Sequence, residues 1–257
     1  MTVITKLSCI LLCLLSFGLS AMEQAPLAKA HTNIADKTRL QRGAKLYMNY
    51  CAACHSLRYM RYSRMASDLG IVDEGGSVDK DLLFNNLVFT EAKIGEPIVN
   101  ALSETDARQW FGVVVPDLSL IARVRGADWL YSYLTGFYRD ENRPFGSNNR
   151  VFSDVAMPNV LAPLQGEQIA VYKVNTFEFN GHKKEQKILS HLQSLGGGEM
   201  TSQQFNSAVN DIVTFLVYVG EPDKLKSQAI GLWVLLFLTL LLVLAIALKT
   251  VYWRKLH

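Results

Sequence analysis

The stretch Tyr50–Leu57 reads YCAACHSL and places two cysteines three positions apart, with a histidine directly after the second. Three chemistries use close variants of this pattern: covalent haem attachment, thiol–disulfide exchange and zinc binding. A structural zinc site takes four protein ligands, usually with a second Cys or His pair at short spacing. The sequence disfavours zinc because no such pair occurs among the other histidines, which are His31, His182, His191 and His257.

The residues before this motif distinguish the two remaining chemistries. Apolar positions step by four and three along one stripe of a helix, and the stripe consists of Leu40, Ala44, Tyr47, Cys51 and Cys54. Both sulfurs are therefore expected on one face, at the C-terminal end of that helix. A thiol–disulfide motif instead follows a strand and opens a helix, whose N-terminus activates the thiol. The pattern favours one covalently bound haem c, attached through Cys51 and Cys54, with His55 directed at the iron.

Cysteine usage supports this interpretation. The N-terminus has a single cation, Lys6, then an apolar run from Leu7 to Leu19 and small residues, which is typical of a secretory signal peptide. We therefore predict a signal peptide at residues 1–21. The four cysteines are Cys9, Cys13, Cys51 and Cys54. Only the motif pair remains after signal removal, so the exported domain has no disulfide framework. A thiol oxidoreductase stays an alternative only if these thiols are free.

The other end of the chain carries AIGLWVLLFLTLLLVLAIAL, Ala229–Leu248, without a charge. A helix of about 20 apolar residues matches the ~30 Å hydrocarbon core of a bilayer. Trp233 and Trp253 lie near its two ends, where interfacial aromatic residues are common. We predict an extracytoplasmic haem domain at 22–228, a transmembrane helix at 229–248 and a cytoplasmic tail at 249–257.

Charge and periodicity describe the exported domain further. Of 26 lysines and arginines, one lies in the signal and three in the tail, which leaves 22 against 23 acidic residues. This balance gives no sign of nucleic-acid binding. Helical spacing from Phe205 to Val219, with a stop at Gly220 and Pro222, predicts a core helix that packs on the helix of the haem motif. The fold class is mostly α, with one C-terminal transmembrane helix.

The second axial ligand of the iron decides the redox chemistry, because a thioether raises the reduction potential. Met157 lies in VFSDVAMPNVLAPL, and Pro158 favours extended backbone there, so its side chain can project from a loop. We predict Met157 as the distal ligand. His182 or His191 is the next candidate, and an open site is the last. Four other methionines lie too near the motif or in a polar stretch: Met48, Met60, Met65 and Met200.

Three segments resemble the cytochrome c1 family, the haem subunits of bacterial cytochrome bc1 complexes. They are RGAKLYMNYCAACHSLRY (Arg42–Tyr59), VPDLSLIARVRGADWLYSYLTGFYRD (Val115–Asp140) and RPFGSNNRVFSDVAMPNVL (Arg143–Leu161). The resemblance implies a class I cytochrome c-like haem domain with long loops. It also implies Arg125 near a haem propionate, and Trp129 at a position often filled by Tyr. The cofactor-binding set is Cys51, Cys54, His55, Met157 and Arg125, with His55 and Met157 on the metal.

The resemblance further implies electron relay without substrate chemistry of its own. A Rieske iron–sulfur protein would reduce the haem, which would pass single electrons to a soluble or membrane-bound cytochrome c. Cytochrome b and membrane lipid are the expected membrane partners in this quinol–cytochrome c reductase. The haem domain is expected on the periplasmic side of the bacterial inner membrane. Alternatives are a membrane-tethered cytochrome c of another respiratory chain and a haem-based sensor.

Two further parts of the sequence are candidates for partner contacts. Five acidic residues are hypothesised to attract a basic cytochrome c, and a solvated loop is the alternative. They are Asp68, Asp73, Glu74, Asp79 and Asp81. The segment from about Gln165 to Met200 is either a partner contact or a long surface excursion.

Overall fold

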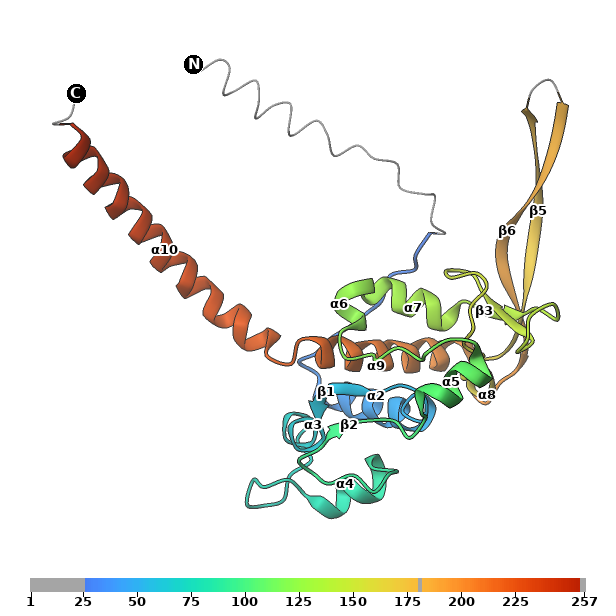
Figure 1. The fold of residues 1–257 in the computed structure, drawn as a ribbon, viewed down its shortest axis with the longest axis horizontal. Coiled ribbons are helices and arrows are strands. Elements are labelled where there is room, and N and C mark those ends of the chain that lie inside the picture. The colour runs from blue at the N-terminus through green and yellow to red at the C-terminus, as the bar shows by residue number, and fades with distance from the viewer. Residues whose placement is uncertain (1–25, 180–181, 255–257) are drawn as a thin grey trace.

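The computed structural model describes residues 26–179 and 182–254 and has a mostly helical body (Figure 1). A long hairpin and a long C-terminal helix project from this body. The mostly α fold class predicted from the sequence is confirmed. The predicted signal peptide at 1–21 lies outside the described residues.

Two helices, α2 (Lys37–Tyr50) and α9 (Ser202–Gly220), form the centre of the body. Leu40, Ala44 and Tyr47 of the predicted stripe lie on the buried face of α2, whereas Cys51 and Cys54 follow the end of the helix at Tyr50. Helix α9 begins with a capping box between Thr201 and Gln204. The rings of Tyr47 and Phe215 meet between the two helices, with centroids 5.6 Å apart. The predicted packing of this late helix on the helix before the motif is confirmed.

A buried carboxylate also joins these two helices. The Asp211 side chain on α9 is only 3% exposed, and it accepts a hydrogen bond from Arg42 Nε at 2.6 Å. Arg39 Nε lies 3.1 Å from the other oxygen of the same carboxylate. The hydrogen bond to Asp211 is the main reason that the pKa of Arg42 is raised above its ordinary value. A buried charge without such partners would be costly.

Helix α9 is buried along most of its length because it has neighbours on two sides. Helices α6 (Ile121–Arg125) and α7 (Ala127–Thr135) cover one side, and α2 covers the other (Figure 1). Residues 28–31 cross over this layer. Ala28 N donates to Ser132 Oγ at 2.8 Å, and His31 N donates to Asn210 Oδ1 at 2.7 Å.

A second group of elements lies mostly below α2 in Figure 1, and its last helix, at 104–111, lies level with the end of α2. The strand that follows the motif, β1, pairs antiparallel with β2, so the chain leaves the motif directly into this group. The elements of this group are β1 (Leu57–Arg61), α3 (Tyr62–Leu69), α4 (Lys80–Leu87), β2 (Pro97–Ile98) and α5 (Glu104–Phe111).

The segment at 165–200 is a long antiparallel hairpin of β5 (Gly166–Phe179) and β6 (His182–Gly197). It follows α8 (Ala162–Gln165) and stands out from the body (Figure 1). Its base packs on the small sheet of β3 (Phe137–Arg139) and β4 (Ser147–Asn149). Gln168 Nε2 donates there to the Phe137 carbonyl at 2.8 Å. The hairpin therefore protrudes from a fixed base, and whether its outer part contacts a partner stays open.

Helix α10 (Lys224–Trp253) contains the predicted transmembrane segment. It is the one helix in the described part of the chain that is long and apolar enough to cross a membrane. The helix begins at Lys224, five residues before the predicted transmembrane segment at 229–248. No Gly or Pro lies between Asp223 and Ala229 to interrupt a helix, so α10 extends back to the body.

Candidate functional site

The two cysteines lie in the turn that closes α2. Cys51 caps the helix, and its carbonyl accepts hydrogen bonds from Cys54 N at 3.1 Å and His55 N at 2.8 Å. Neither thiol is in a disulfide. Burial raises the pKa of the Cys51 thiol to about 12, and it raises the pKa of Cys54 as well. Such thiols stay protonated at neutral pH, which is the opposite of the activated thiolate in an oxidoreductase.

The His55 ring is fixed by the segment that precedes α6. Its Nδ1 lies 2.8 Å from the carbonyl oxygen of Pro116. A carbonyl only accepts hydrogen bonds, so Nδ1 carries the proton and Nε2 keeps its lone pair for a metal. Burial lowers the pKa of His55 below its ordinary value, outweighing the opposite effects of Pro116 and Asp117. The imidazole is therefore neutral and oriented, as a metal ligand must be.

Asp117 holds this segment against the residues that follow the motif. Its carboxylate accepts from Arg58 N at 2.9 Å and from Ser119 N at 2.8 Å. Leu118 N donates to the Ser56 carbonyl at 2.9 Å, which adds a backbone bond between the same two segments. Residues 116–119 thus form a strap over His55.

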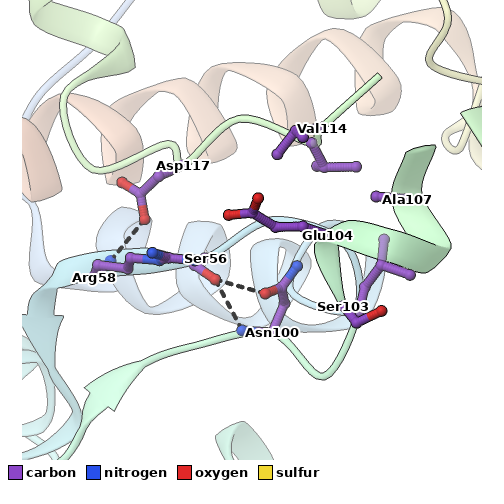
Figure 2. A pocket seen from close by; sticks show the side chains of 10 residues that line it. Ser56, Arg58, Asn100, Ser103, Glu104, Ala107, Val114 and Asp117 are labelled. Carbon is purple, nitrogen blue, oxygen red and sulfur yellow. Dashed lines mark hydrogen bonds between the residues drawn. The ribbon is translucent and has the colours of Figure 1, made fainter. Parts of the chain in front are cut away.

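Asn100 secures the other side of the motif. Its Nδ2 donates to the Cys54 carbonyl, and its Oδ1 accepts from Ser56 Oγ at 2.8 Å. Figure 2 shows Ser56 and Asn100 beside Asp117 at a small pocket that Glu104 also lines. The cavity volume is about 30 Å³, which holds a water molecule and not a porphyrin. Ser56, Asn100 and Asp117, which line this pocket, are the residues that hold the motif in place.

Met157 lies in the loop between β4 and α8 and is half-buried. Its sulfur accepts a hydrogen bond from the hydroxyl of Tyr133 on α7, with an Oη–Sδ distance of 3.3 Å. Burial raises the pKa of the Tyr133 phenol well above its ordinary value, so the hydroxyl stays protonated. Among the described residues no hydrogen bond joins Met157 to His55 directly. The chain connects them, because the strap on His55 leads through α6 into α7.

Arg125 ends α6 and is exposed. Its guanidinium lies over the Trp129 ring, 4.9 Å from the centroid. Trp129 stacks in turn on Tyr133, with centroids 4.9 Å apart and planes 9° from parallel. A row of side chains therefore runs from Arg125 at the surface to the sulfur of Met157. Sequence reasoning treated Arg125, Trp129 and Met157 separately, and the structure brings them together.

The other candidate iron ligands lie elsewhere. Met48, Met60 and Met65 are buried in the hydrophobic core, at 4%, 1% and 0% exposure. His191 is exposed on β6 of the protruding hairpin. His182 opens β6, and its side chain lies outside the described part of the structure. Met157 differs from the core methionines because it is absent from the hydrophobic core and lies on a loop.

These residues are the donor set that a c-type haem requires. Two thiols outside a disulfide occupy one turn, an oriented imidazole follows them, and a loop thioether is held by a neighbouring hydroxyl. The fold and this site define a class of protein, a mostly helical c-type cytochrome domain followed by one long apolar helix.

The chain belongs to the Cytochrome C1 family, whose family model matches residues 28–256. It is 45% identical over 231 residues to cytochrome c1 of Allochromatium vinosum, covering 90% of each chain. It is 39% identical over 238 residues to the ammonia monooxygenase gamma subunit of Nitrosomonas europaea, covering 93% of this chain and 92% of that one. Cytochrome c1 of Rhodospirillum rubrum is 27% identical over 237 residues, covering 85% and 82%. The resemblance to the cytochrome c1 family that the sequence shows is confirmed. The protein is an electron carrier of this family, and the family implies a c-type haem.

Sequence reasoning missed the residues that support the site. Pro116 acts through its backbone carbonyl, which leaves no side-chain signature in a sequence. Asn100 and Asp117 lie far from the motif in the chain and approach it only through the fold. Tyr133 had a readable signal, because its four-residue spacing from Trp129 places both rings on one face of a helix.

Proposed function

We propose that this chain carries single electrons from a Rieske iron–sulfur protein to a c-type cytochrome within a respiratory bc1 complex. In this proposal one haem c would be bound covalently through Cys51 and Cys54, and His55 and Met157 would hold its iron. When bound, the haem supplies one-electron redox chemistry. The observation that carries the proposal is the His55 ring, whose Nδ1 is held by Pro116 so that Nε2 is available.

The chain's own residues have three tasks in this function. The turn after α2 presents both thiols from one side, and Asn100 keeps that turn in place. The strap fixes the imidazole before any ligand binds, so little reorganisation accompanies a change of redox state. The half-buried loop of Met157 supplies a thioether, which favours a high reduction potential.

Arg125 is proposed as the cation near a haem propionate. Its guanidinium is exposed and lies on the Trp129 ring, and no salt bridge involves it among the described residues. A guanidinium held by an aromatic face keeps its five N–H donors free at the edge, where they can meet a carboxylate.

The membrane arrangement is part of the proposal. We place residues 22–228 on the periplasmic side of the inner membrane, 229–248 in the bilayer and 249–257 in the cytoplasm. The length and apolar composition of α10 support one crossing. Protease treatment of spheroplasts should digest the domain, whereas inside-out vesicles should protect it. Protection in spheroplasts would contradict this orientation.

Ligation by Met157 is tested by a redox titration of the full-length protein beside Met157→Ala. We expect a positive potential in the wild type and a much lower one in the variant, at equal haem content. Met60→Leu, a change at a buried core methionine, serves as the control. A low potential that Met157→Ala does not change would contradict the assignment and point to another axial ligand.

A second candidate function is electron relay for a different membrane oxidoreductase. The likeness to a protein named ammonia monooxygenase gamma subunit favours it specifically. Purification of the chain from native membranes through a C-terminal tag separates the two. Cytochrome b and a Rieske protein should co-purify, together with quinol–cytochrome c reductase activity. A complex that lacks both subunits would exclude the bc1 assignment.

A further inference from the structure

Tyr133 and Met157 make a contact that electron carriage by itself does not require. The Tyr133 hydroxyl donates to Met157 Sδ at 3.3 Å. A thioether is a weak hydrogen-bond acceptor, so a hydroxyl directed at it is an uncommon use of a half-buried phenol. The sulfur has two lone pairs, and this bond occupies one and leaves the other for a metal.

The Tyr133 ring has little freedom to turn away from the sulfur. Trp129 stacks on one face, at 4.9 Å between centroids and 9° between planes. Phe137 meets the ring edge to face, at 5.2 Å and 71°. Arg125 covers Trp129 in turn, so the aromatic pair is fixed from the surface side. Packed aromatic neighbours of this kind hold a ring in one position.

We propose that Tyr133 is a positioning residue that orients the Met157 thioether and raises the reduction potential of the haem which that sulfur ligates. This inference rests on the proposed ligation by Met157 and adds a residue to it. In this proposal the side chains from Arg125 through Trp129 and Tyr133 to Met157 have a function. They set how strongly the sulfur donates electron density to the iron.

The direction of the effect follows from the hydrogen bond. A donated proton withdraws electron density from the sulfur, which then stabilises oxidised iron less than a free thioether does. The equilibrium therefore moves toward the reduced form, and the potential rises. Hydrogen bonds from the second shell tune metal sites in this way.

The test compares Tyr133→Phe with Tyr131→Phe in the full-length, haem-loaded protein in detergent. Phenylalanine keeps the ring and its stacking, so only the hydroxyl is lost. Tyr131 is a matched control on the same helix. Burial likewise raises its pKa, but its hydroxyl makes no hydrogen bond among the described residues. Potentiometric titration, the sulfur-to-iron charge-transfer absorption of the oxidised form and chemical unfolding are recorded for each variant.

We expect Tyr133→Phe to shift the redox equilibrium about fivefold toward the oxidised form, which is about 40 mV at 59 mV per tenfold. Its charge-transfer band should move or weaken, while Tyr131→Phe matches the wild type in both. An unchanged potential and band in Tyr133→Phe would overturn the inference, even if the variant were less stable. The variant Met157→Leu distinguishes a failure of the proposed ligation by Met157 from a failure of the proposed role of Tyr133. A wild-type band that persists in Met157→Leu overturns the ligation and this inference together. A band lost in Met157→Leu but untouched in Tyr133→Phe overturns this inference alone.

Discussion

Gly43 on α2 lies directly against Phe215 on α9, and a Cβ built on Gly43 would lie 2.8 Å from the Cβ of Phe215. The same Cβ would overlap the Asp211 carbonyl. Real Cβ atoms do not approach backbone so closely. The crossing of the two central helices therefore depends on the missing side chain of one glycine. Because α2 ends in the cysteine turn, the position of the haem motif depends on it too.

We expect Gly43→Ala to lower the free energy of unfolding by about 1–3 kcal/mol, the usual cost of overpacking a core. Haem content should fall as well, because α2 must move away from α9 and the turn that bears the cysteines moves with it. Urea unfolding followed by circular dichroism and the haem absorbance of purified protein measure the two effects.

Gly95→Ala is the matched control for this change. Gly95 is exposed, and a Cβ there would meet nothing within 4 Å. Equal stability of the two variants would contradict the close helix crossing.

Asp117 provides a test of the strap over His55. Removing its carboxylate in Asp117→Ala breaks the bonds from Arg58 N and Ser119 N. We expect a loss of about 2 kcal/mol, since bonds to a charged acceptor are worth more than neutral ones. The amide of Leu118, which bonds to the Ser56 carbonyl, should exchange its hydrogen faster.

Asp117→Asn retains one acceptor and should lie between the wild type and Asp117→Ala in both measurements. If Leu118 exchanged at the wild-type rate in Asp117→Ala, the strap would be held by other contacts.

The five acidic residues proposed to steer a basic cytochrome c are not equivalent in the structure. Asp68 bonds to Arg64 at 2.5 Å and to the Tyr218 hydroxyl at 2.8 Å. Asp79 caps α4, and Asp73 accepts from Ser77 N. Glu74 and Asp81 make no hydrogen bond or ion pair among the described residues. Of the five, only Asp68 is paired with a cation, and Glu74 and Asp81 are the two whose charges can be removed without breaking a contact in the described part of the chain.

We therefore expect the double variant Glu74→Gln, Asp81→Asn to slow electron transfer to a basic cytochrome c at low salt and to flatten its dependence on ionic strength. Stability should fall by less than about 1 kcal/mol, because Asp81 lies in the first turn of α4. Asp68→Asn is the comparison: it should lower stability through the lost bonds to Arg64 and Tyr218. Stopped-flow kinetics across a salt series measures the steering, and an unchanged salt slope in the double variant would favour the solvated-loop alternative.

The sequence predicted the parts of this molecule that depend on short-range pattern. The stripe from Leu40 to Tyr47 predicted α2, and an uncharged run predicted the central part of α10. The roles of Cys51, Cys54, His55, Met157 and Arg125 in binding haem stay predictions. The supports of the site depend on long-range contacts, such as Pro116 with His55 and Asn100 with Cys54, and pattern does not encode these. The hairpin was predictable in principle, because Asn180-Gly181 between alternating strands is a strong hairpin signal.

The base of the hairpin of β5 and β6 differs in its contacts from the outer part, which is called the outer hairpin. At the base, Glu167 pairs with Arg139 at 3.0 Å, and Gln168 donates to the Phe137 carbonyl at 2.8 Å. Residues 173–176 and 184–188 are exposed. A two-stranded sheet with both faces in water contributes little stability.

We expect that excising 174–187 and joining Lys173 to Ile188 through an Asn-Gly turn leaves haem content unchanged and the unfolding free energy within about 0.5 kcal/mol of wild type. The join is geometrically suitable, because Lys173 and Ile188 are opposite each other in the antiparallel register. Gln168→Ala, at the base, should cost about 1 kcal/mol or more through the lost bond to the Phe137 carbonyl. If excision destabilised the domain as much as Gln168→Ala does, the outer hairpin would be part of the folding unit. If it left the isolated domain intact but lowered the yield of the assembled complex, the outer hairpin would serve assembly.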